Sequence, residues 1–451
     1  MTARRVGLLG ATGIGVGSML GAGVFSDMWV DVLAAGRWYL LALGLAAAIA
    51  IANALSTAQL AAAHPVAGGS YAYGRAELSH WAGHVAGAAF LVGKTASVAV
   101  GAVVLGTYVL PGHAQGIATA AIALVWALNA RGITKTAGGA TAIAIVVSAS
   151  LAALVAFAVG TPVIYGWFAY APMSGETYEP SVLDIALHGG EGSLAQVPVA
   201  AAAAFFAFAG YARIATLGEE VREPERTIPR AIVIALAVVL ALYLAVGIAL
   251  AVHVGYDGLV AVLPQSADAG EALQDAPLER LADAVGFPLG LVTATAALSV
   301  FGAMLAVLAG AGRTAMAMAR EGDLPRGLAR QGGSGAPWLA ELVSALAAIA
   351  LVWTQGTSLL LVSVATILTY YAVANAAAIA QSRGGRRATL RVPVAVSALG
   401  LVGCVALALV AAPSAVGEGP GWVPWALAVT VLGWPSVAFL ARRGALGPKS
   451  R

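Results

Sequence analysis

The chain reads Gly13-Ile14-Gly15-Val16-Gly17-Ser18-Met19-Leu20-Gly21-Ala22-Gly23-Val24-Phe25 within its first long apolar segment, and glycine recurs at every second to fourth position. Each glycine costs a helix about 1 kcal/mol relative to alanine, so a helix that merely crosses a bilayer has no use for them. Backbone groups left unpaired at the middle of a membrane are tolerated only where they line a cavity or a binding site. The run therefore predicts an interrupted membrane helix with a binding site at the interruption.

The composition is typical of a membrane protein. Of the 451 residues, 60% are hydrophobic and only 10% are charged, whereas a soluble protein carries about 25% charged residues. Apolar runs longer than about 18 residues recur along the chain and predict an all-α polytopic membrane protein with about twelve transmembrane helices. The expected spans cover residues 7–34, 38–62, 81–110, 114–130, 138–160, 197–218, 229–253, 287–318, 337–353, 357–380, 392–412 and 421–441.

Basic residues fix the expected orientation of these spans. With a cytoplasmic N-terminus, Arg37 and Arg280 are the only Lys or Arg residues that fall on the outside, while most of the others fall on the inside. Together with an Ala-, Gly- and Arg-rich composition, this predicts a multi-pass protein of a bacterial plasma membrane with both termini in the cytoplasm. The net charge of +3 reflects this asymmetry, so we expect membrane lipid and no nucleic acid as a partner.

A second interruption is expected in the sixth span, at Phe205-Phe206-Ala207-Phe208-Ala209-Gly210-Tyr211-Ala212-Arg213. Interrupted helices at matching positions, five spans apart, are typical of inverted-repeat transporters. Half-helices that end at the midplane offer N–H groups at one tip and C=O groups at the other, and a zwitterion matches both. We expect its carboxylate near Gly21, Ala22 and Gly23, and its ammonium near the carbonyls of Met19, Phe206 and Ala209. The candidate substrate-binding residues are Gly17, Ser18, Met19, Gly21, Ala22, Gly23, Phe206, Phe208, Ala209, Gly210 and Arg213.

The same residues also have a packing interpretation. Gly17 and Gly21 form a GxxxG pattern, which is typical of helix–helix contacts in membranes. The phenylalanines of the sixth span would fit a hydrophobic core equally well. Two interruptions at matching positions favour the binding site, and we expect Phe206 to cover it.

Several of these residues lie in segments that resemble a known family. The first helix, from Gly15 to Phe25, resembles the amino acid–polyamine–organocation permeases and, within them, the cationic amino acid transporter branch. Residues 206–211, 214–232 and 313–325 are similar to the same group, as is Pro65-Val66-Ala67-Gly68-Gly69-Ser70-Tyr71-Ala72-Tyr73-Gly74-Arg75, whereas Arg213 departs from the cationic-transporter pattern. The resemblance implies amino acid transport by alternating access in a five-plus-five inverted repeat with two extra helices. The implied divisions are 1–160 for the first repeat, 161–196 for an extracellular loop, 197–391 for the second repeat, and 392–451 for two accessory helices and a cytoplasmic tail.

Two charged side chains fall deep inside the expected spans, Lys94 in the third and Arg213 in the sixth, and no Asp or Glu does. A charge at mid-bilayer costs at least about 2.5–3.5 kcal/mol and marks a functional site by default. Burial disfavours the charged form of Lys94, so we expect it to load and release a proton as the coupling residue. The alternative is a structural lysine bonded to carbonyls of the broken helices. Proton-coupled relatives carry such a lysine on the fifth helix, where residues 147–151 here have none.

Arg213 has two interpretations. It contacts a substrate carboxylate, or it lies lower in the helix and reaches toward Glu219 and Glu220. Two fixed cations and no fixed anion are an awkward setting for an arginine or lysine substrate, although the resemblance implies a cationic one. We therefore leave the side-chain class open and lean towards a neutral amino acid.

Rival functions find less support in the residues. The six histidines fall at span ends or in loops, and their spacing along the chain predicts no metal site. No span carries paired carboxylates, so we expect neither an enzyme nor a cofactor. A transporter of polyamines or other organic amines, and a transporter-like amino acid sensor, remain as alternatives.

Overall fold

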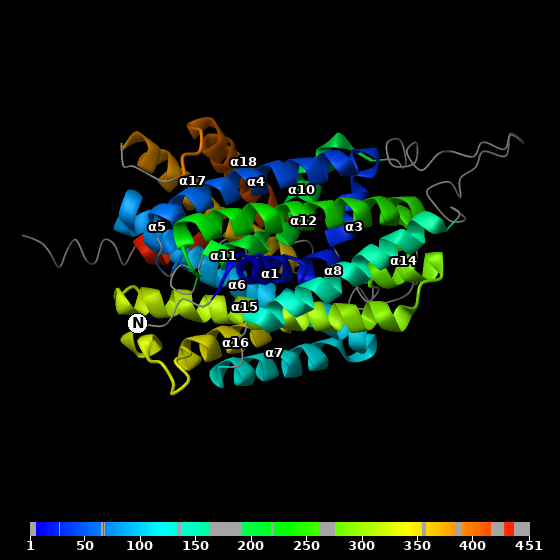
Figure 1. Cartoon of the computed structure of the whole chain (residues 1–451), viewed down its shortest axis with the longest axis horizontal. Helices are drawn as coiled ribbons and strands as arrows, with labels where there is room; N and C mark the ends of the chain where they lie inside the picture. The colour runs from blue at the N-terminus through cyan, green and yellow to red at the C-terminus, as the bar shows by residue number, and fades with distance from the viewer. Residues whose placement is uncertain are drawn as a thin grey trace, which may run out of the picture.

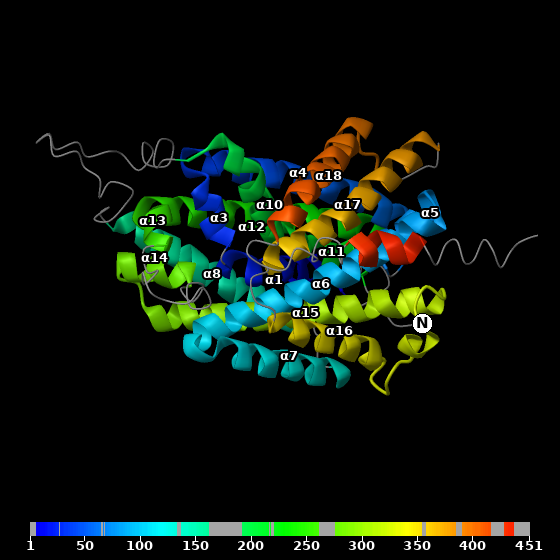
Figure 2. The ribbon, with the colours of Figure 1, turned by 180° about the vertical axis from the view of Figure 1, so that it is seen from behind.

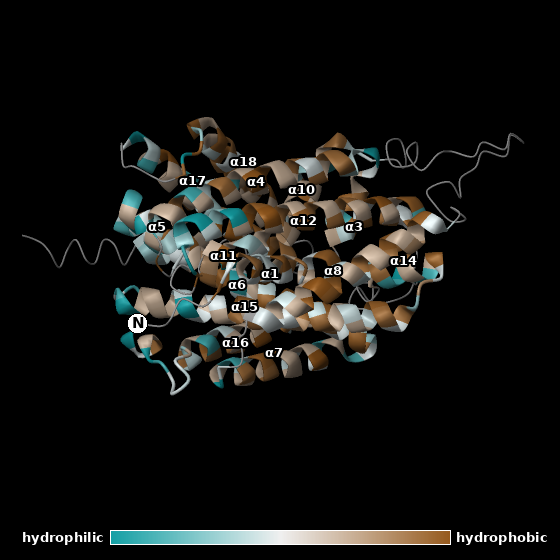
Figure 3. Ribbon diagram, in the orientation of Figure 1, coloured by the Kyte–Doolittle hydropathy of each residue, from teal (hydrophilic) through white to brown (hydrophobic). Residues whose placement is uncertain are grey.

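The computed structural model describes residues 6–26, 28–64, 66, 68–132, 137–161, 192–215, 217, 221–260, 276–353, 358–384, 390–415 and 428–436. Within these residues the chain forms a bundle of helices that run along one common direction, with no β-strand (Figure 1). Hydrophobic residues cover most of the helix length, and hydrophilic residues gather at the end of the bundle that holds α5 (Figure 3). This distribution is that of a membrane-spanning bundle.

The helix bounds follow the hydropathy pattern. In the first half they are α1 (Leu8–Met19), α2 (Ala22–Phe25), α3 (Met28–Ala34), α4 (Tyr39–Ala63), α5 (Ser70–Glu77), α6 (His80–Val109), α7 (Ala114–Ala130) and α8 (Ala137–Gly160). In the second half they are α10 (Val197–Phe208), α11 (Ala212–Ala215), α12 (Pro224–His253), α13 (Gly255–Val260), α14 (Pro277–Val285), α15 (Leu289–Arg320), α16 (Trp338–Val352), α17 (Leu359–Arg383) and α18 (Val394–Ser414). Single turns of 3₁₀ helix lie at Gly36–Trp38, Pro111–His113, Leu194–Gln196, Ala209–Tyr211 (η5) and Arg326–Ala329, and a π-helical turn lies at Val429–Gly433.

Nine of the segments described are long and apolar enough to cross a membrane. The fourth and ninth expected spans correspond to the shorter helices α7 and α16, of 17 and 15 residues. Of the twelfth, expected at 421–441, the described part is 428–436. The all-α polytopic fold is thus confirmed for the described chain, whereas the count of twelve spans is not.

The two expected interruptions differ in kind. The first span breaks fully, because α1 ends at Met19 and α2 begins at Ala22, with Gly21 at φ −61° and ψ −127° between them. The sixth span keeps its helical direction, because α10 passes through the single 3₁₀ turn η5 into α11. The interruptions touch: a Cβ atom added to Gly210 would lie 2.6 Å from the backbone nitrogen of Met19. Glycine at this position is therefore required by the close approach of two backbones.

The interrupted helices occupy the centre of the bundle. Helix α1 packs on α8 and α12, and α10 packs on α4, α3 and α18. On one side, α6, α7, α15 and α16 pack against one another and lie side by side (Figure 2). The breaks therefore face this four-helix group.

The expected loop at 254–286 contains helices that hydropathy did not predict. Helix α14 begins with Pro277 in its first turn and ends at Val285, and the next residue, Gly286, adopts the left-handed conformation at φ +73°. These are ordinary start and stop signals for a helix. It buries Leu278 and Leu281 against the bundle and is too short to span a membrane.

A cavity at the two helix interruptions

A small, partly open cavity of about 40 Å³ lies where the interruptions meet the four-helix group. A volume of this size holds a few water molecules, since one water needs about 10–15 Å³. The lining comes from α1, α2, α6, α10, η5 and α15. The lining residues are Ser18, Met19, Ala22, Gly23, Lys94, Ser97, Gly101, Phe206, Ala209, Gly210, Val300, Ala303, Met304 and Val307.

Eight of the candidate residues predicted from the sequence share this cavity. They are Ser18, Met19, Ala22, Gly23, Phe206, Ala209, Gly210 and the coupling candidate Lys94. Phe206 lies in the lining, where we had expected it to cover the substrate. Four other candidates, Gly17, Gly21, Phe208 and Arg213, lie outside the lining.

Packing explains three of the candidates that lie outside. A Cβ atom at Gly17 would rest 3.7 Å from Ala144 of α8, and one at Gly21 would collide with Ala303 of α15. Phe208 is fully buried and meets Tyr243 edge to face, with ring centroids 5.3 Å apart. These residues hold the helices together rather than facing the cavity.

Lys94 is buried, and its ammonium points to the second interruption. Its Nζ donates to the carbonyl oxygen of Ala209 at 3.3 Å and lies 5.8 Å from the ring centroid of Phe90. The hydroxyl of Tyr371 donates to the same carbonyl at 3.0 Å. Lys94 is the only charged residue in the described lining, and it connects α6 directly to η5.

Side chains from other helices also donate hydrogen bonds to further backbone carbonyls at the interruptions. The Tyr243 hydroxyl donates to Met19, and its oxygen lies 3.1 Å from the carbonyl oxygen of Ala207. Ser299 donates to the carbonyl of Leu20 at 2.8 Å. Of the three carbonyls expected to receive a substrate ammonium, two thus already accept hydrogen bonds from side chains. Sequence reasoning missed these donors because they lie on other helices, with no local pattern that marks them.

The side of the cavity formed by α15 was also missed. Val300, Ala303, Met304 and Val307 follow a helical spacing and give this side an apolar surface. Gly101 of α6 lies opposite: a Cβ atom added there would be 3.2 Å from Met304 and 3.4 Å from Val300. The spacing along α15 was visible in the sequence but is the same as that of any buried helix face.

Arg213 belongs to a separate buried cluster. Glu341, at 2% exposure, receives a hydrogen bond from the Asn129 side chain and interacts electrostatically with Arg313 and Arg213. We expected no acidic residue deep inside a span, and Glu341 lies only one turn into α16, yet its side chain is buried within the protein. Glu219 and Glu220, the alternative partners of Arg213, lie outside the described residues.

Comparison with known proteins identifies the family. A family model described as amino acid permease matches residues 6–436, which is nearly the whole chain. The chain belongs to the amino acid permease family.

Two relatives show how far this likeness extends. The permease is 40% identical over 418 residues to an uncharacterized transporter of Mycobacterium tuberculosis, covering 92% of this chain and 88% of that protein. It is 25% identical over 348 residues to the aromatic amino acid transport protein AroP of Corynebacterium glutamicum, covering 74% of this chain and 70% of that protein. The permease is thus a multi-pass membrane transporter of amino-acid type. These relatives lend no support to the cationic branch.

Proposed function

We propose that the permease carries neutral amino acids across the membrane by alternating access, with Lys94 as the proton-coupling residue. The charge of the cavity supports the neutral substrate. Within the described lining, Lys94 is the only ionisable side chain, and no carboxylate stands ready to pair with a cationic substrate. A buried charge without a partner is costly, so a substrate with a basic side chain would be disfavoured.

The two ends of an amino acid find different surroundings in the cavity. Its carboxylate faces Lys94 and the backbone N–H groups of Ala22 and Gly23, which open α2 and have no acceptor within that helix. Its ammonium faces the carbonyl of Met19, and its side chain meets the apolar surface of α15. An apolar surface of this kind suits a neutral side chain.

The packing suggests which helices move. Tyr243 of α12 hydrogen-bonds to the carbonyls of Met19 and Ala207, which ties the first, sixth and seventh spans together. Helices α6, α7, α15 and α16 form a second packed group, and the cavity lies between the two groups. In this proposal the first, second, sixth and seventh spans rock against α6, α7, α15 and α16, which exposes the cavity to each side in turn.

Uptake into proteoliposomes tests the proposal. The purified permease is supplied with labelled neutral, acidic and basic amino acids and with polyamines, each with and without a pH gradient. We expect saturable uptake and counterflow of neutral amino acids, stimulated by the gradient. Uptake restricted to basic amino acids or polyamines would refute the neutral substrate, uptake indifferent to the gradient would refute coupling, and binding without flux would indicate a sensor.

A further inference from the structure

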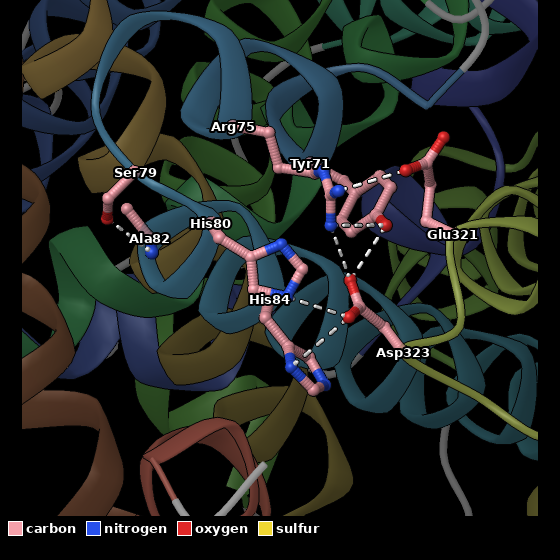
Figure 4. A network of polar contacts seen from close by, with 8 residues as sticks. All are labelled: Tyr71, Arg75, Ser79, His80, Ala82, His84, Glu321 and Asp323. Atoms are coloured by element: carbon pink, nitrogen blue, oxygen red, sulfur yellow. Dashed lines mark hydrogen bonds and ion pairs between the residues drawn. The ribbon is translucent and has the colours of Figure 1, made fainter. Parts of the chain in front are cut away.

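A second cluster of polar side chains lies outside the cavity, between α5, the start of α6 and the turn after α15 (Figure 4). His80 Nε2 lies 3.0 Å from Oδ1 of Asp323, and His84 Nδ1 lies 3.9 Å from the same oxygen. One ligand atom from each of the three residues lies within 4.8 Å of the others. His80 and His84 are four residues apart on one helix, and Asp323 joins them from a distant segment, an arrangement that spacing along the chain did not indicate.

We propose that His80, His84 and Asp323 bind a divalent transition-metal ion, with Zn²⁺ as the best match. Imidazole nitrogen and carboxylate oxygen are ordinary zinc ligands, at about 2.0–2.2 Å from the metal. Two such ligands of a tetrahedral ion stand roughly 3.3–3.5 Å apart. The observed separations of 3.0 and 3.9 Å from Asp323 Oδ1 fall on either side of this value, and all three ligand atoms lie within 4.8 Å of one another, so binding requires the side chains to draw together around the ion.

The histidine spacing supports this assignment. Residues four apart on a helix project from the same face, and paired histidines at this spacing are a recurrent zinc-binding arrangement. Both histidines lie in the first turns of α6, where the helix is firmly set by Ser79, whose side chain accepts from the backbone N–H of Ala82 at 3.1 Å. Two of the three ligands are therefore presented by one rigid element.

The carboxylate is oriented by partners of its own. Oδ2 of Asp323 accepts from the Tyr71 hydroxyl at 2.8 Å and from Arg75 at 3.0 Å, which turns Oδ1 toward the histidines. Hydrogen bonds of this kind to a ligating carboxylate are characteristic of metal sites.

Charge and access also suit a cation. Asp323 and Glu321 bring two negative charges, while Arg75 brings one positive charge and pairs with both. With neutral histidines the cluster therefore carries a net negative charge. The side chains of Asp323 and His84 are buried, at 0% and 1% exposure, and that of His80 is 25% exposed. His80 thus provides the route by which an ion enters.

A bound ion would join the start of α6 to the turn after α15, and through Asp323 to α5. This role does not depend on what the cavity transports. The competing state is a hydrogen-bonded histidine–carboxylate pair that takes no metal. Binding of Zn²⁺ distinguishes the two.

The full-length protein, purified in detergent without a histidine tag and stripped with chelator, is titrated with Zn²⁺ and with Co²⁺. We expect one ion per chain, a rise in unfolding temperature with Zn²⁺, and a visible Co²⁺ spectrum of histidine–carboxylate ligation. His80→Ala should weaken Zn²⁺ binding more than about tenfold, and Tyr71→Phe, which spares the ligands, by about tenfold. His113→Ala, an exposed histidine in another part of the chain, should bind as wild type.

Two results would overturn the proposal. The first is a wild-type protein that binds no Zn²⁺ or Co²⁺ above the level of a His80→Ala/His84→Ala double variant. The second is wild-type affinity in His80→Ala. Because His80 is partly exposed, its variant is expected to fold, and its circular dichroism and elution volume check this directly.

Discussion

Replacing Lys94 by methionine removes the charge from the cavity lining and keeps an unbranched side chain. The variant loses a hydrogen bond from a charged donor to Ala209, worth about 1.5–3 kcal/mol. It also loses the contact with the Phe90 ring, worth about 0.5–2 kcal/mol. Against this, it no longer holds a charge within the membrane, which costs at least about 2.5–3.5 kcal/mol. The two sides nearly cancel, so the variant should fold with a stability close to that of the wild type.

The backbone carbonyl that Lys94 contacts also favours an unchanged stability in this variant. Ala209 keeps its hydrogen bond from Tyr371 at 3.0 Å, so no buried acceptor is stranded by the substitution. The expected effect of Lys94→Met is therefore on transport rather than on folding.

The assay is uptake into proteoliposomes across a range of pH. We expect the wild type to respond to pH and Lys94→Met to transport at a rate that does not. Lys94→Arg provides the opposite case, because arginine stays charged, and it should give little transport at any pH. Ser97→Ala, one turn along α6 in the same lining, is the matched control and should keep the pH response. A wild-type pH profile in Lys94→Met would refute the coupling role, and its failure to fold would refute the energy balance.

Three further predictions rest on packing. Gly101→Val fills the cavity from α6 and should weaken substrate binding about 10–200-fold in a binding titration, whereas Gly116→Val, which points into open space on α7, should have no effect. Gly210→Ala drives a Cβ atom into the backbone of Ser18 and should lower the yield of folded protein, measured by size-exclusion chromatography. Glu341→Gln removes a buried carboxylate that interacts electrostatically with Arg313 and Arg213 and should lower the unfolding temperature.

Each of these has a contrary outcome. Wild-type affinity in Gly101→Val would show that the substrate does not bind in the proposed cavity. A well-folded Gly210→Ala protein would contradict the close approach of the interruptions. An unchanged unfolding temperature in Glu341→Gln would show that the two arginines do not depend on that carboxylate.

Features local to the sequence were predictable. Runs of apolar residues predicted the long helices, and the glycines from position 13 onward predicted the break between Met19 and Ala22. Both features depend on the backbone and its nearest neighbours in the chain. An interruption at Ala209–Tyr211 was expected, but it is only a single 3₁₀ turn, and the sixth span continues in the same direction. The packing of α10 on α4 and α18 holds that direction, and this packing is not visible in the local sequence.

Features that depend on distant partners were not predictable. Glu341 is buried and interacts electrostatically with Arg213 and Arg313, which lie on other helices and which no local pattern connects to it. His80 and His84 gained a third partner only when folding brought Asp323 beside them. The apolar side of the cavity on α15 was indistinguishable from ordinary core until the opposing Gly101 was placed.

The phenol of Tyr243 has a single hydrogen to give, yet two carbonyl oxygens, those of Met19 and Ala207, lie within its reach. At any instant the Tyr243 hydrogen points mainly to one of them. A rotation of the O–H bond alone, with no shift of a heavy atom, exchanges the two. The hydroxyl therefore couples the two interrupted helices, because a new donor at either carbonyl would leave the Tyr243 hydrogen for the other.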